Sequence, residues 1–160
     1  MSEDETPDAV ADLHERNRRI REEMGGAARV EQMHADGVPT IRDHIDAFVD
    51  EGSFREIGTH SRSMRLDDRH NTPGDGKVGG EGTVAGRPVS VSGDDITVKK
   101  GSSAIVGSRR LHRLYERAVE RGMPYVYFGE TGGGRIPDLI GAEGIADVAP
   151  SPYVASRRRK

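Results

Sequence analysis

The sequence predicts an α/β fold, and three consecutive features of the chain support this prediction. Residues 78–92 read as a β-hairpin, because Val89 and Val91 alternate with serines in its second arm. An amphipathic helix is predicted from Ser108, and the apolar run 125–128 reads as a strand that leads into a glycine turn. A strand, a helix and a second strand in this order make a β-α-β unit.

The helix after Ser108 is the clearest element of the sequence. Ser108 is predicted to cap it, Gly122 to close it, and Pro124 to prevent its continuation. Its apolar residues recur with helical spacing and form a one-sided stripe, namely Leu111, Leu114, Tyr115, Ala118 and Val119. Residues 96–98 are predicted to be the strand that precedes this helix.

Three helices are predicted ahead of the hairpin, over residues 9–24, over residues 27–35 and from Thr40 onward. Thr40 and Asp43 have the spacing of a capping box. The third helix has an apolar face that consists of Ile41, Ile45, Phe48 and Val49. A short strand is expected over residues 54–57, an exposed loop over residues 60–71, and disorder over residues 1–8.

Composition excludes several classes of function. The 160 residues carry a net charge of −3, which gives no reason to expect a nucleic-acid partner. The chain has no cysteine, so disulfides and cysteine-based zinc sites are excluded. No apolar run is long enough for a membrane span. Histidines are scattered without metal-ligand spacing, so no metal site is predicted, and a cytoplasmic location is expected.

The stretch Gly129-Glu130-Thr131-Gly132-Gly133-Gly134-Arg135-Ile136 is the leading candidate for a site. Three consecutive glycines allow backbone N–H groups to approach a bound group without hindrance from side chains. Such N–H groups at a helix start suit an oxyanion or a phosphate. A flexible surface loop is the alternative interpretation.

A second candidate loop, Lys99-Lys100-Gly101-Ser102-Ser103, combines positive charge with small residues before a helix. It lacks the spacing of a P-loop. Because loops at the carboxyl ends of neighbouring parallel strands open on the same edge of a sheet, we expect this loop to meet the glycine turn. A solvated loop is the alternative.

Two charged residues of the glycine turn have open roles. Glu130 is the nearest carboxylate and could act as a general acid or base, although a capping or loop-ordering role is favoured. Arg135 could bind a phosphate or a carboxylate, and a structural salt bridge is the alternative.

Together these stretches resemble the carboxyltransferase subunit, or beta chain, of biotin-dependent acyl-CoA carboxylases of the acetyl-/propionyl-CoA type. The glycine turn from Glu130 to Ile136 is similar to the family's D-S-G-G-A-R-I. The remaining similar positions, in order along the chain, are Gln32, His34, Gly37, Thr40, Ile45, residues 51–54, residues 73–76, Val78, Gly82, residues 86–89, residues 94–95, residues 97–98, residues 101–102 and residues 122–124.

The resemblance implies a partial crotonase-like (ClpP/crotonase) α/β fold of β-β-α units, preceded by N-terminal helices. It implies transfer of a carboxyl group from carboxybiotin to an acyl-CoA. In that chemistry Gly132, Gly133 and Gly134 would supply backbone oxyanion donors. Substrate-binding roles would fall to Lys99, Lys100, Gly101, Ser102, Thr131 and Arg135.

The implied partners are an acyl-CoA, the biotin carboxyl carrier that bears the cofactor biotin, and the biotin carboxylase subunit. Residues 29–160 are expected to be the N-terminal part of a carboxyltransferase domain, and residues 1–28 a disordered or helical extension. Family members are longer and have two such halves, so we expect an oligomer that needs a second half or a partner subunit, and no activity from this chain alone.

The sequence departs from the family at Lys99 and Lys100, which stand where an aromatic residue and a glycine are common. Two other interpretations therefore stay open. One is a crotonase-like acyl-CoA hydratase, hydrolase or decarboxylase. The other is a non-catalytic remnant that binds a partner subunit or CoA.

Overall fold

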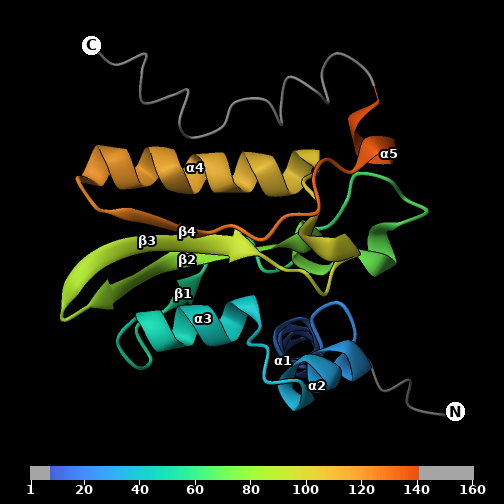
Figure 1. Ribbon diagram of the computed structural model, residues 1–160, viewed down its shortest axis with the longest axis horizontal. Helices are drawn as coiled ribbons and strands as arrows, with labels where there is room; N and C mark the ends of the chain where they lie inside the picture. Colours follow the sequence, from blue (N-terminus) through green and yellow to red (C-terminus); the bar gives the residue numbers. More distant parts are fainter. Residues whose placement is uncertain (1–7, 141–160) are drawn as a thin grey trace, which may run out of the picture.

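The computed structural model describes residues 8–140, which form a small sheet between two helical layers. Figure 1 shows helix α4 on one face of the sheet and α1, α2 and α3 on the side of the other face. The elements are α1 (Ala9–Glu22), α2 (Ala27–Ala35), α3 (Ile41–Phe48), β1 (Arg55–Glu56), β2 (Lys77–Val84), β3 (Arg87–Asp94), α4 (Ile105–Arg121), β4 (Tyr125–Phe128) and α5 (Ile136–Leu139). Short 3-10 turns cover Arg69–Asn71, Pro73–Gly76 and Lys99–Gly101.

The sheet has the order β1-β2-β3-β4, and its first three strands are antiparallel. Strand β4 lies parallel to β3, and α4 makes the crossover between them. The predicted hairpin is therefore confirmed, and a β-α-β unit is present with β3, and not residues 96–98, as its first strand. A hairpin followed by a helix and a parallel strand is the β-β-α arrangement that was expected.

The main apolar core lies between the sheet and α3. Its buried members are Met24, Ile41, Ile45, Val49, Val78, Val89 and Val91. Close contact here depends on Gly93, because a Cβ atom at this position would lie 2.1 Å from Ile41 Cδ1. Helix α3 is fixed at its start by the predicted capping box between Thr40 and Asp43.

Helix α4 covers the opposite face of the sheet with Leu111, Leu114 and Ala118 of its predicted stripe buried, whereas Val119 of the same stripe is exposed. Its predicted start was wrong. The helix begins at Ile105 after the N-cap Ala104, and not at Ser108. The Gly107 N–H in the first turn donates to the Asp75 carboxylate at 2.7 Å, so a side chain distant in sequence caps the helix.

The predicted strand over residues 96–98 was also wrong. Asp95 accepts hydrogen bonds through its side chain from the Thr97 N–H, at 2.9 Å, and from the Thr97 hydroxyl. Its carbonyl accepts from the Val98 N–H at 3.1 Å. These local bonds make a turn instead of a strand. The strand that precedes α4 in the β-α-β unit is consequently β3.

Helices α1 and α2 pack against the body of the molecule through the turn that joins them. The Gly25 N–H donates to the Thr97 hydroxyl at 2.9 Å, and Arg29 donates to the Thr97 carbonyl. Asp8 caps α1. The separation of residues 1–28 from residues 29–160 stays a prediction. Residues 1–7 and the stretch 141–160, with its basic end Arg157 to Lys160, lie outside the described residues.

Candidate functional site

The two candidate loops meet at one edge of the sheet, beyond the ends of β3 and β4. Ser103 and Gly134 form an isolated parallel bridge. The Ser103 N–H donates to the Gly133 carbonyl at 2.8 Å, and the Arg135 N–H donates to the Ser103 carbonyl at 2.7 Å. The predicted convergence is confirmed, and this junction of the two loops is the candidate site.

The three glycine N–H groups differ in whether they have a hydrogen-bond acceptor. Gly132 donates to the Lys100 carbonyl at 2.8 Å, and Gly133 donates to the Thr131 hydroxyl at 3.1 Å. Within residues 8–140, the Gly134 N–H has no acceptor. All three glycines are exposed. Among the three glycines, Gly134 is thus the one whose backbone N–H has no acceptor within the described residues and is available to a ligand.

The lysine loop has an unusual backbone. Lys99 and Lys100 have φ angles of 47° and 55°, in the left-handed region that non-glycine residues rarely adopt. The Lys99 ammonium pairs with Asp68 at 2.9 Å. The exposed Lys100 ammonium has no ionic partner in the described part of the chain. Lys100 is therefore the cation of this loop that is free to attract an anionic group.

Arg135 is buried, and its guanidinium is already engaged. It pairs with Asp75 at 2.6 Å and donates to the Ser102 carbonyl at 3.2 Å and the Ser102 hydroxyl at 3.3 Å. Asp75 is itself fully buried and also caps α4. This placement supports the structural alternative for Arg135, because little of its hydrogen-bonding capacity is left for a substrate.

The remaining predicted residues hold the junction together. The Thr131 hydroxyl donates to the Gly101 carbonyl at 3.0 Å. Glu130 has an exposed side chain, and its N–H donates to the Asp94 carboxylate at 2.9 Å. Ser102 is 8% exposed. Their binding roles stay predictions.

Sequence reasoning missed Lys77, which lies underneath the junction and is 1% exposed. Burial lowers its pKa, although the charge of Asp94 and the hydrogen bond to it oppose this shift. A signal was available in the sequence. Lys77 is a charged residue at the start of a strand that is otherwise made mostly of valine and glycine.

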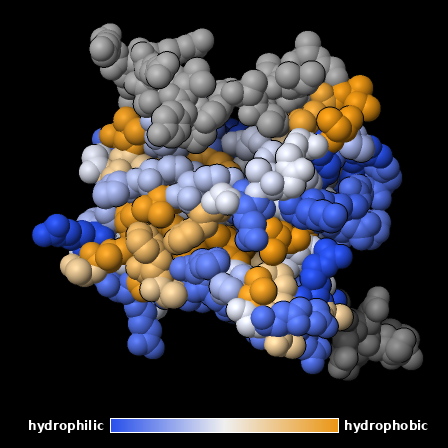
Figure 2. Space-filling model, viewed as in Figure 1, coloured by the Kyte–Doolittle hydropathy of each residue, from blue (hydrophilic) through white to orange (hydrophobic). Residues whose placement is uncertain are grey.

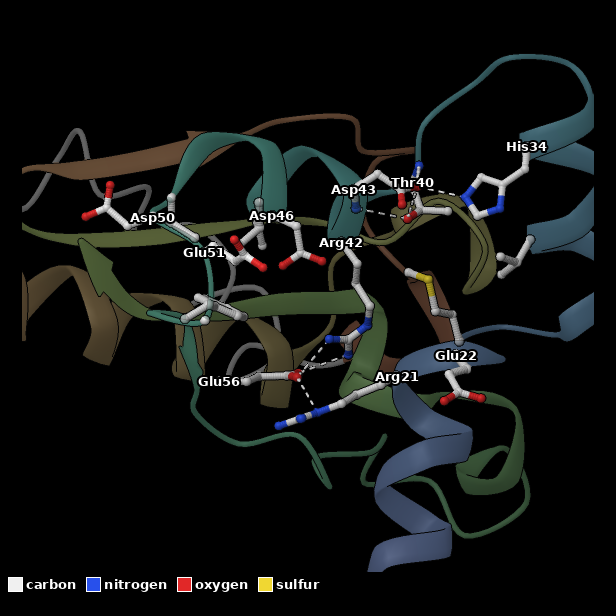
Figure 3. A pocket seen from close by; sticks show the side chains of 16 residues that line it. Arg21, Glu22, His34, Thr40, Arg42, Asp43, Asp46, Asp50, Glu51 and Glu56 are labelled. Carbon is white, nitrogen blue, oxygen red and sulfur yellow. Dashed lines mark hydrogen bonds and ion pairs between the residues drawn. The ribbon is translucent and has the colours of Figure 1, made fainter. Parts of the chain in front are cut away.

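Three hollows among the described residues lie away from this junction. Figure 3 shows the largest of them, of about 820 Å³, where Arg42 and Arg21 point toward the buried carboxylate of Glu56. A second, of about 500 Å³, lies beside α4, and a third, of about 420 Å³, is lined by several cations including Lys99 and Arg29. Of the predicted site residues, only Lys99 lines any of these three hollows.

The described residues contain no group of histidine and acidic side chains that could hold a metal ion. Within the same residues, no helix is long and apolar enough to cross a membrane. The surface near the junction does carry apolar side chains. Ile136 and Ile140 are 68% and 81% exposed, and Figure 2 shows an apolar patch at the place of α5.

A hairpin, a crossover helix and a glycine turn that faces a second loop define an α/β protein of the crotonase-like class. The family model described as "Carboxyl transferase domain" matches residues 32–157, so the chain belongs to the carboxyl transferase domain family.

Named relatives agree with this assignment. The methylmalonyl-CoA carboxyltransferase 12S subunit of Propionibacterium freudenreichii subsp. shermanii is 36% identical over 126 residues, which cover 77% of this chain and 24% of that subunit. The propionyl-CoA carboxylase beta chain of Saccharopolyspora erythraea is 36% identical over 143 residues, which cover 88% of this chain and 26% of that one. The chain thus spans about a quarter of the length of these relatives.

Solved structures have the same fold. The transcarboxylase 12S structure with methylmalonyl-coenzyme A and methylmalonic acid bound has a TM-score of 0.76 and 34% identity, over 82% of this chain and 26% of that chain. A single-chain, multi-domain long-chain acyl-CoA carboxylase has a TM-score of 0.76 and 31% identity, over 86% of this chain and 15% of that chain.

Proposed function

We propose that this chain provides the acyl-CoA side of a biotin-dependent carboxyltransferase, with the junction of the two loops as its substrate site. The observation that carries the proposal is the free Gly134 N–H, which lies where the two loops are bonded to each other. Relatives named for propionyl-CoA and methylmalonyl-CoA support an acyl-CoA substrate.

The chemistry of the site fits this role. To accept a carboxyl group at its α-carbon, an acyl thioester loses a proton and gathers negative charge on its carbonyl oxygen. A fixed N–H group aimed at that oxygen stabilises the charge, and the loss of one such donor costs about 3 kcal/mol in other enzymes. Gly134 is the candidate donor, and the hydrogen bonds of Gly132 and Gly133 keep the turn in place.

Lys100 would act earlier, by attracting an anionic portion of the ligand. Lys100 is exposed and directly precedes Gly101 in the chain. The Gly101 carbonyl accepts a hydrogen bond from the Thr131 hydroxyl of the glycine turn, so Lys100 is next to the junction. Coenzyme A carries phosphates, so a free cation beside the thioester site favours its capture. Biotin, on a carrier protein, would supply the carboxyl group, and we assign none of the described residues to biotin.

We also propose that the chain works within an oligomer and with the carrier and carboxylase subunits of such a complex. Support comes from the transcarboxylase 12S relative, whose structure is described as a hexamer assembly. A cytoplasmic location is part of the same proposal.

The test is calorimetric titration of the chain with CoA, acetyl-CoA and propionyl-CoA. We expect the acyl-CoA esters to bind more tightly than CoA, because only they present a thioester oxygen to Gly134. Lys100→Gln should weaken binding of all three by roughly tenfold, the loss of about 1.4 kcal/mol. Arg87→Gln, which removes the same charge at the other end of β3, should leave affinity unchanged.

Failure of every ester to bind would contradict the proposal. Because the chain alone is expected to be inactive, isotope transfer from carboxybiotin to a bound acyl-CoA is measured with the missing half or partner subunit added, and transfer separates a carboxyltransferase from the crotonase-like alternatives. Hydration, hydrolysis or decarboxylation of the ester without carboxybiotin would favour those alternatives, and binding without turnover even with the partner present would favour the non-catalytic interpretation.

A further inference from the structure

Lys77 and Asp94 face each other across the hairpin, at the end of the sheet where both site loops start. They are direct partners in the register of β2 and β3. Their side chains are 1% and 0% exposed and form an ion pair. Lys77 directly follows the Pro73–Gly76 turn, and Asp94 is the last residue of β3 before the turn at residues 96–98, so a bond between their side chains acts at the base of the junction.

The Lys77 ammonium connects to the first loop through two of its three N–H donors. Besides Asp94, it donates to the Gly101 carbonyl at 2.8 Å and to the Ser103 hydroxyl at 3.1 Å. An ammonium has three N–H donors, so all of them are used. Gly101 and Ser103 flank Ser102, and Ser103 is the residue that bridges to Gly134.

The Asp94 carboxylate connects to the second loop. Its other oxygen accepts the Glu130 N–H at 2.9 Å, and the oxygen that faces Lys77 also accepts the Tyr127 hydroxyl at 2.7 Å. A continuous chain of bonds therefore runs from Ser103 through Lys77 and Asp94 to Glu130. It crosses from one loop to the other, and it begins at the residue that bridges to Gly134.

We propose that Lys77 and Asp94 are positioning residues that fix the distance between the two loops, and so hold the Gly134 N–H where the thioester oxygen of an acyl-CoA would lie. This inference rests on the proposed function. A buried ion pair contributes little net stability compared with packed apolar side chains, because both charges lose their water. Its contribution here is geometric, since each bond has a direction and a specific partner.

The first experiment measures the loops without ligand. Lys77→Met removes the ammonium and keeps an unbranched side chain of similar length. In the full chain, we expect amide hydrogen exchange at Ser103, Glu130 and Gly132 to accelerate at least tenfold relative to the strand amide of Val91. Equal acceleration at Val91 and at the three loop amides would overturn the inference, since it would show only general destabilisation.

Arg42→Met is the matched control, because it breaks the ion pair of Arg42 with the buried Glu56 carboxylate on β1. Neither side chain forms a hydrogen bond or an ion pair with residues 99–103 or 129–136 of the described chain. This variant should leave the ratio of loop exchange to Val91 exchange unchanged. A second variant, Asp94→Asn, covers the case in which Lys77→Met does not fold. It should accelerate exchange of the Glu130 amide at least tenfold, because the carboxamide replaces one of the two accepting oxygens with an N–H donor. An unchanged Glu130 amide would contradict the inference.

The second experiment measures binding. Lys77→Met should reduce the preference of the chain for propionyl-CoA over CoA by at least fivefold, because only the acyl ester depends on Gly134. A merely structural role would weaken both ligands equally, and this result would overturn the inference. If the unaltered chain binds neither ligand, the proposed function fails, while the exchange experiment still decides whether the pair positions the loops.

Discussion

Asp75 shows how one residue can hold three segments together. It has a φ of 51° inside the Pro73–Gly76 turn, and its carboxylate binds both Arg135 and the first turn of α4. The sequence indicated a turn here and gave no sign of the buried charge. The pairing depends on the approach of residues 75, 107 and 135, which are distant along the chain.

We expect Asp75→Ala to lower the free energy of unfolding by about 3–5 kcal/mol, because it leaves the Arg135 guanidinium buried without its ionic partner. Asp75→Asn should lower it less, since the amide still accepts the Gly107 N–H and asparagine tolerates a left-handed backbone. Urea denaturation measures both. Asp46→Ala, at an exposed position of α3, is the control and should change stability by less than about 0.5 kcal/mol.

At the scale of the element, the start of helix α3 is determined by residues close together in the sequence. The Asp43 carboxylate accepts the Thr40 N–H at 2.7 Å and lies 2.8 Å from His34 Nε2. Burial alone would raise the pKa of Asp43, but the hydrogen bonds from Thr40 and His34 outweigh it and hold the pKa below its ordinary value. Both capping residues are local, so the spacing of Thr40 and Asp43 was sufficient to predict them.

A depressed carboxyl pKa stabilises the fold above the unfolded value of about 3.9, and this contribution is lost as the pH falls through the folded pKa. We therefore expect Asp43→Asn to cost about 1 kcal/mol at pH 7, the usual value of a cap, and less at pH 3. Urea titrations of both proteins at the two pH values measure this difference. An equal cost at both would contradict the role of the charge, and Asp46→Asn should show no difference at either pH.

At the scale of the whole molecule, the helices are unequally anchored to the rest of the structure. Helix α1 buries only Ile20, and α2 buries no residue, whereas α4 buries Leu111, Leu114 and Ala118 against the sheet. Most ion pairs within α1 are solvent-exposed and add little stability. Helices α1 and α2 are thus less firmly anchored than α4.

We expect native-state hydrogen exchange of α1 amides to be at least 100-fold faster than exchange of the central strand amides of Val78 and Val91, which require global unfolding. Exchange of α1 at the strand rate would show that residues 1–28 belong to one cooperative unit with the rest. That result would contradict the predicted boundary at residue 28. A truncation that starts at Arg29 should keep the strand amides protected if the boundary holds.

The sequence by itself determined the helices, the hairpin, the β-α-β unit and the family, because periodicity, caps and glycine turns are local features of the chain. It also placed the glycine turn and the lysine loop at one edge of the sheet. It misplaced the start of α4 and the strand over residues 96–98, where side chains such as Asp75 and Asp95 compete for backbone N–H groups.

Only the tertiary structure decided which groups of the junction are engaged. Gly132 is bonded to Lys100, Arg135 is buried with Asp75, and Gly134 keeps a free N–H. Lys77 and Asp94 lie 17 positions apart, and the register of β2 and β3 makes them partners. Hydrogen-bond pairing depends on distances between segments that no local pattern encodes, so the site's fine geometry was decided by how the segments pack.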